Sequence, residues 1–127
     1  MLAGLDHLVV TVTDMGRAVD FYSRVLGLDV RYRDAQRVDL MLGDTALRLH
    51  QTDTDIAPIS ATPTPGSLDL CLRCQLPLDE FMDHLKALSV TIELGPVERQ
   101  GATGAIESVY LRDPDGNLLE ICRPLGR

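Results

Sequence analysis

Hydrophobic and polar residues alternate along residues 6–12, which read Asp-His-Leu-Val-Val-Thr-Val. Side chains two residues apart share one face of a strand, so His7 lies opposite the apolar positions Leu8, Val10 and Val12. Residues 15–26 instead repeat their apolar positions with helical spacing, between an N-cap at Asp14 and a terminating Gly27. The pattern therefore predicts a strand followed directly by a helix.

The same order of patterns occurs twice along the chain. After the first helix, short alternating runs predict three strands, at residues 29–33, 38–42 and 46–51. A stretch rich in Thr, Pro, Asp and Ala follows at residues 52–66, without periodicity. The second copy begins with a strand at 67–74 and a helix opened by Pro77. It ends with three further strands, at residues 91–94, 107–112 and 118–122.

This doubling predicts an α+β fold made of two βαβββ modules. Module 1 covers about residues 5–51, residues 52–66 are the linker, and module 2 covers about residues 67–123. With 127 residues, the chain is expected to be a single domain, too short for two independent cores. A duplicated half-sheet can bring its first and last strands together, so one pocket is expected to hold His7 and Glu120.

Composition narrows the range of partners. No apolar run approaches the roughly 20 residues of a membrane span, and the N-terminus lacks the features of a signal peptide. A net charge of −7 argues against nucleic acid, since that binding depends on Lys and Arg. We therefore expect a cytoplasmic protein with a small-molecule partner.

Cys71 and Cys74 have C-x-x-C spacing, but they fall within a strand pattern and are interpreted as structural.

Alternation places several polar residues on the strand faces turned away from the helices. These residues are His7, Arg48, His50, Asp69, Cys71, Arg73, Glu120 and Cys122. Imidazole nitrogens and carboxylate oxygens are a mixed ligand set for a divalent metal such as Mn, Fe, Co, Ni or Zn. The alternative interpretation is an ordinary solvated sheet face.

Three segments of the sequence resemble the vicinal oxygen chelate superfamily, which contains glyoxalases, bleomycin resistance proteins and extradiol dioxygenases. The segments are Asp6-His7-Leu8-Val9-Val10, Ala18-Val19-Asp20-Phe21-Tyr22 with Val25-Leu26-Gly27-Leu28, and Leu111-Arg112-Asp113-Pro114-Asp115-Gly116-Asn117-Leu118-Leu119-Glu120. Other motifs, such as Gly95-Pro96-Val97-Glu98-Arg99, are similar to a small subgroup of glyoxalase-domain or lactoylglutathione-lyase-like proteins. The resemblance implies a cupped, mixed eight-stranded sheet with the helices on its convex face. It also implies a metal on the concave face and a homodimer.

Carried over position by position, His7 and Glu120 match the recurrent metal ligands of the family. The other two corners depart from its pattern, because Asp69 stands where His is usual and Arg48 stands nearest to the usual Glu or Gln. His50 lies two residues beyond Arg48, on the same face. One expected ligand set is therefore His7, His50, Glu120 and Asp69, and the alternative is no metal.

The resemblance implies chelation of vicinal substrate oxygens, with the metal acting as a Lewis acid. A lyase or isomerase is the leading hypothesis, with Glu120 or Asp69 as the catalytic base. Two His and one carboxylate would instead suit an Fe(II) dioxygenase, and a metal-free drug-binding protein is the third alternative. Arg48, Arg73 and Tyr110 are candidate substrate-binding residues. The alternative for the two arginines is an ion pair with Asp69 or Glu120.

Overall fold

The computed structural model describes residues 1–126, which divide into two compact units. Unit 1 contains residues 1–68 together with the short segment Pro114–Gly116. Unit 2 contains residues 69–113 and the chain from Asn117 onward. Each unit holds one βαβββ module, as the repeat in the sequence predicts. Among the described residues, no helix has the length and hydropathy needed to cross a membrane.

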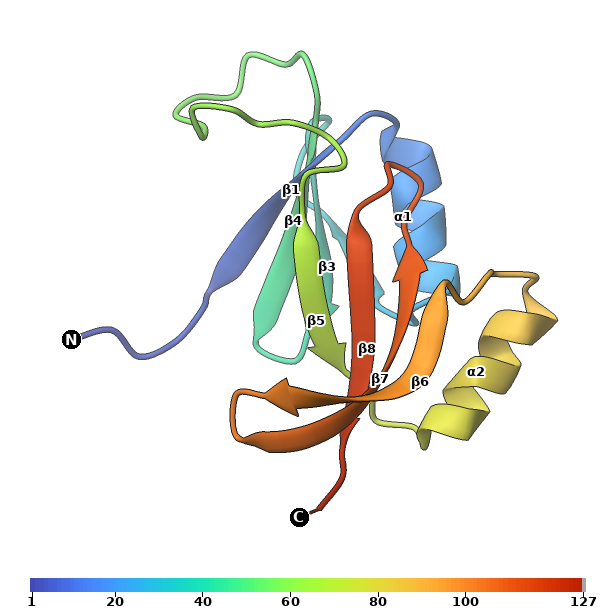
Figure 1. Cartoon of the computed structure of the whole chain (residues 1–127). Helices are drawn as coiled ribbons and strands as arrows, with labels where there is room; N and C mark the ends of the chain where they lie inside the picture. The colour runs from blue at the N-terminus through green and yellow to red at the C-terminus, as the bar shows by residue number, and fades with distance from the viewer. Residues whose placement is uncertain (127) are drawn as a thin grey trace. The chain divides into compact units, whose positions relative to one another are not determined.

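Unit 1 is a four-stranded sheet with one helix. Its elements are β1 (His7–Val12), α1 (Met15–Arg24), β2 (Asp29–Tyr32), β3 (Arg37–Leu42) and β4 (Thr45–Gln51), coloured blue to green in Figure 1. The strand order is β1-β4-β3-β2, with β1 parallel to β4 and the other pairs antiparallel. The helix contacts β2, β3 and β4.

Unit 2 repeats this arrangement. Its elements are β5 (Asp69–Arg73), α2 (Leu78–Ala87), β6 (Leu94–Gly101), β7 (Gly104–Arg112) and β8 (Leu118–Pro124), coloured green to red in Figure 1. The order β5-β8-β7-β6 matches that of unit 1, again with one parallel pair, β5 and β8. The α+β fold of two modules is confirmed, and its eight strands form two four-stranded sheets.

Alternation within the strands builds the core of each unit. Val10, Val12, Leu47 and Leu49 are at most 2% exposed, and so are Val109, Leu111 and Leu119 of unit 2. At about 25 cal/mol per Å² of apolar area removed from water, such residues supply most of the drive to fold. Their strand neighbours point to the opposite face, so burying one set of side chains orients the polar set.

The segment after α2 differs from the prediction. The sequence predicted strands only at 91–94 and 107–112, but β6 and β7 also extend through most of residues 95–106 as a long hairpin (Figure 1). The predicted strand at 91–94 overlaps β6 only at Leu94. Pro96 is tolerated because β6 is an edge strand and the residue falls at an irregularity in its pairing with β7. The pairing register shifts between Leu94 and Val97.

Candidate functional site

Three of the predicted site residues lie on the polar face of the sheet in unit 1. In the parallel pair of β1 and β4, Val9 is opposite Arg48 and Thr11 is opposite His50. His7 lies on the same face because it is two residues from Val9. The structure therefore brings together His7, Arg48 and His50 as alternation predicted.

His7 is held by a hydrogen bond at each ring nitrogen. Its Nδ1 lies 2.8 Å from Oδ2 of Asp6, and its Nε2 lies 3.3 Å from Nη1 of Arg48. A carboxylate accepts and a guanidinium only donates, so these partners assign the proton of a neutral ring to Nδ1. The assignment leaves Nε2 with a lone pair. A histidine that ligates a metal commonly has this arrangement, with a carboxylate at its other nitrogen.

Arg48 has a carboxylate partner within unit 1, on the neighbouring strand β3. Its Nε and Nη2 donate to the two carboxylate oxygens of Asp39, at 2.8 and 3.1 Å. Arg33 Nε also donates to Oδ2 of Asp39. Asp39 is fully buried, and the hydrogen bond from Arg48, followed by that from Arg33, holds the pKa of this carboxyl below its ordinary value. Asp39, Arg33, Arg48 and His7 are called the Asp39 cluster below.

His50 lies beside this cluster without a hydrogen bond at Nε2. That nitrogen is buried, and no described residue partners it. Burial lowers the pKa of His50, and the positive charges of Arg37 and Arg48 lower it further. A neutral imidazole at this position is a possible ligand or hydrogen-bonding group, and its surroundings are electropositive.

Glu120 lies at the centre of the equivalent face in unit 2. It is half-buried, and its Oε2 accepts a 2.6 Å hydrogen bond from the hydroxyl of Ser108, which is fully buried on β7. Tyr110 and Cys71 are its direct neighbours on β7 and β5. A charge-assisted hydrogen bond of this length fixes the orientation of the carboxylate.

Cys71 is the third side chain in this part of unit 2. Burial of its thiol raises the pKa of Cys71 to about 12, with further contributions from a hydrogen bond with Cys122 and from the charge of Glu120. The residue as a whole is exposed, whereas Cys122 is buried. Cys71 therefore remains a neutral thiol at physiological pH, which supports the structural interpretation of the cysteines rather than a nucleophilic one.

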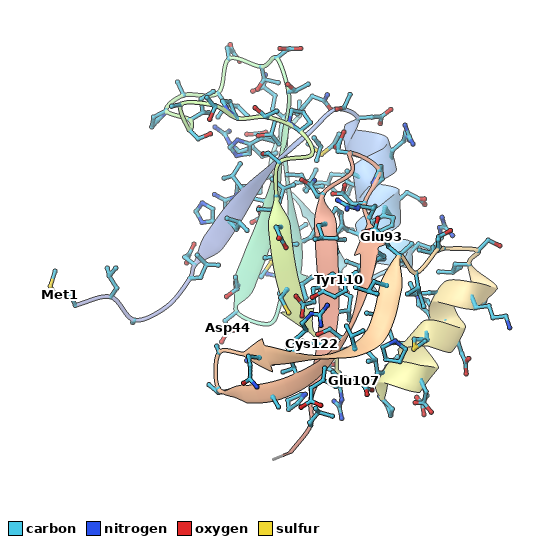
Figure 2. All side chains as sticks on the ribbon, in the orientation of Figure 1. Met1, Asp44, Glu93, Glu107, Tyr110 and Cys122 are labelled. Carbon is cyan, nitrogen blue, oxygen red and sulfur yellow. The ribbon has the colours of Figure 1, made fainter. Side chains whose placement is uncertain are left out.

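The remaining predicted residues lie on β5 and β7 of unit 2. Asp69 and Arg73 are exposed on β5. Tyr110, labelled in Figure 2, accepts a 3.1 Å hydrogen bond from Nε of Arg99, whose guanidinium carbon lies 5.7 Å from the ring centroid. Its polar group therefore already has a partner within β6 and β7.

Two of the predicted ligands have donor atoms that suit a divalent ion, but the described residues do not form a complete ligand group. His7 Nε2 and the carboxylate of Glu120 are appropriate donors. Within residues 1–126, however, no three His, Cys, Asp or Glu side chains form a group able to hold a metal. The ligand set of His7, His50, Asp69 and Glu120 therefore stays a prediction.

Asp39 is the residue that the sequence interpretation missed. The two-residue turn Gly43-Asp44 joins β3 to β4 and pairs Leu42 with Thr45. Counting back from this turn places Asp39 directly opposite Arg48. The hairpin register therefore contained the signal for the pair.

Two βαβββ modules with His and Glu on their polar strand faces define a glyoxalase-type protein. A profile of the Glyoxalase/Bleomycin resistance protein/Dioxygenase superfamily matches residues 4–121, and the chain belongs to this superfamily. The chain is 43% identical to virulence protein STM3117 of Salmonella typhimurium, over 92% of this chain and 81% of that protein. The crystal structure of STM3117 superposes with a TM-score of 0.94 at 40% identity, covering 98% of this chain and 99% of the other.

Two further relatives broaden the comparison. Glyoxalase domain-containing protein RDO1 of Mycosarcoma maydis is 41% identical, over 92% of this chain and 66% of its own length. Metallothiol transferase FosB of Shouchella clausii is 29% identical, over 95% of this chain and 80% of its own.

Proposed function

We propose that the protein is a divalent-metal-dependent enzyme of the glyoxalase type, a lyase or isomerase acting on a small molecule with vicinal oxygens. The observation that carries this proposal is the hydrogen-bonding state of His7. Its Nδ1 donates to Asp6, so the lone pair of Nε2, which accepts a hydrogen bond from Arg48, could bind a metal once that guanidinium moved aside. Similarity to a relative named metallothiol transferase FosB supports a metal in this chain as well.

His7 and Glu120 would hold the metal in this proposal, with His50 and Asp69 as further candidates. The bound ion would act as a Lewis acid on two neighbouring oxygens of the substrate. Ser108 engages only Oε2 of Glu120 and thereby restrains its carboxylate before substrate arrives. Glu120 is also the group that we assign as base, moving a proton on the substrate, with Asp69 as the alternative.

A second candidate function follows from the contact between Arg48 and His7. Nη1 of Arg48 lies 3.3 Å from Nε2 of His7, where a metal would have to bind. Metal binding therefore requires the guanidinium to move aside. If it stays, the protein binds its small molecule without a metal, as a bleomycin-resistance-like binding protein. The contact favours this alternative over a third one, an Fe(II) dioxygenase.

Elemental analysis separates these functions. Protein purified without chelator, and again after reconstitution with Mn, Fe, Ni and Zn in turn, should hold about one ion per chain. His7→Ala and Glu120→Gln should each reduce metal affinity by roughly tenfold or more. His84→Gln is the matched control, since it removes a histidine of α2 that is outside the predicted site, and it should retain the metal.

The outcomes have distinct meanings. Absence of stoichiometric metal from the wild type under every reconstitution condition would reject the metal-dependent enzyme and leave the binding protein. Stoichiometric binding of iron, and of no other metal tested, would favour the dioxygenase. Equal metal content in wild type and His7→Ala would show that the ion binds elsewhere.

A further inference from the structure

The Asp39 cluster contains more positive than negative charge. Two guanidinium groups, from Arg33 and Arg48, converge on the single carboxylate of Asp39, and both donate to its Oδ2. Asp39 is fully buried. Its single negative charge therefore neutralises only one of the two positive charges that contact it. Asp6 is the other carboxylate nearby, but its side chain is 94% exposed and water screens its charge.

Arg48 keeps donors free within this cluster. A guanidinium has five N–H groups, and in the described part of the chain Arg48 uses two of them on Asp39 and one on His7. Its side chain is 20% exposed, so a small molecule can reach it, whereas Asp39 beneath it is inaccessible. The two bonds to Asp39 hold the guanidinium plane in place, which lowers the entropy lost when it binds a ligand.

The strand next to the cluster adds to the positive field. Arg31 on β2 is directly opposite Asp39 in the antiparallel pair, so it shares this face of the sheet. Arg33 is 52% exposed at the end of the same strand. This concentration of arginine stands out in a chain with a net charge of −7, and it indicates an anionic ligand rather than a cationic one.

We propose that the Asp39 cluster is an anion-binding subsite in which Arg48 and Arg33 bind a carboxylate group of the substrate. Asp39 is a positioning residue that orients Arg48 from below. The planar fork of a guanidinium matches a planar carboxylate better than it matches a single point acceptor.

The position of His7 narrows the substrate class further. Nη1 of Arg48 is 3.3 Å from Nε2 of His7. A metal on Nε2 would displace Nη1 from this contact, and a carboxylate bound to the displaced guanidinium would lie beside the ion. A molecule that places an oxygen on the carbon next to its carboxylate satisfies both groups. The substrate is therefore a small 2-oxo or 2-hydroxy carboxylate. This second step rests on the proposed function, whereas carboxylate binding by the cluster does not.

Oxalate titration of chelator-treated protein tests the subsite without a metal. Oxalate is the probe because it carries two adjacent carboxylates and is chemically stable. Binding is followed by calorimetry and by the Nε–H signals of Arg33 and Arg48 in a nitrogen-15 correlation spectrum. Inorganic phosphate is titrated in parallel, and acetate serves as the probe with one carboxylate.

Matched variants locate the binding. Arg48→Gln should weaken oxalate binding at least about tenfold, while Arg24→Gln, which removes an arginine of α1 from the same unit, should change it less than about twofold. Arg48→Lys keeps the charge but not the fork and should fall between them. Circular dichroism checks that each variant is folded.

Each outcome of these titrations either supports or overturns the subsite. Oxalate affinity in Arg48→Gln within twofold of wild type rejects Arg48 as the anchor. Phosphate binding more tightly than oxalate rejects a carboxylate ligand. Metal-free protein that binds oxalate but never takes up a metal would retain the subsite while rejecting the metal-dependent enzyme, so the two proposals fail separately. Metal uptake with no oxalate binding to the metal-free protein would reject the subsite alone.

Discussion

Asp39 shows how a single buried charge can organise a functional face. Its carboxylate has no access to water, and it stays ionised because Arg48 and Arg33 donate to it. Removing one partner of a buried ion pair leaves the other charge poorly solvated, which costs more than the pair contributes to stability. The residue is therefore expected to matter both for folding and for the orientation of Arg48.

Asp39→Asn should lower the free energy of unfolding by about 2 kcal/mol, less than for a fully buried pair because both arginines reach solvent. Urea denaturation measures the change. Asp20→Asn is the control, because Asp20 pairs with Arg24 on the exposed surface of α1, and it should change stability by at most about 0.5 kcal/mol. Equal effects of the two substitutions would contradict the role given to Asp39.

His50 provides a test that depends on pH. Burial and the nearby arginines lower its pKa in the folded state below the ordinary 6.5. As the pH falls through that ordinary value, the unfolded chain binds a proton at His50 that the folded chain does not, so stability is lost. Above it, the imidazole is neutral in both states and contributes no pH dependence.

Wild type should therefore lose stability relative to His50→Gln between about pH 7.5 and about pH 5.5. Denaturation curves of both proteins across this range give the difference. Parallel stability profiles would show that His50 is not desolvated in the folded protein.

At the scale of single elements, some features are predicted by neighbouring residues in the sequence and others depend on distant strands. The cap of α1 is local, and the prediction at Asp14 is confirmed by a 3.0 Å hydrogen bond from the backbone N–H of Arg17 to its carboxylate. The β3–β4 turn is also local, yet it sets the register that pairs Asp39 with Arg48. The edge strand β6 was missed because its Gly and Pro residues mask a pairing made only with the distant β7.

Loss of the α1 cap has a predictable size. Asp14→Ala removes the acceptor for the first turn and should destabilise the protein by about 1 kcal/mol, measured by thermal or urea denaturation. Asp14→Ser keeps an oxygen that can cap and should recover most of that loss. A full loss in the serine variant as well would indicate that Asp14 acts through another contact.

At the scale of the whole molecule, the repeat in the sequence predicted more of the fold than of the site. Period-two alternation and the two helical patterns predict the two modules, because each pattern reflects which side chains are buried within its own unit. Alternation predicted which sheet face Arg48 and Tyr110 lie on, but not their hydrogen-bond partners. Long side chains can reach several neighbours, so the face alone does not identify the contact. The expected metal ligands come from different units, and the sequence contains no constraint on their distances.

The central claim is that this superfamily member holds a divalent ion able to take vicinal oxygens from a ligand. Electron paramagnetic resonance of Mn²⁺ added to metal-free protein, before and after oxalate, tests it most directly. Wild-type protein should broaden the sharp signal of the free ion, and oxalate should then change the spectrum of the bound ion. With His7→Ala protein, neither change should occur. A Mn²⁺ signal identical in wild type and His7→Ala, or unchanged by the protein, would contradict it.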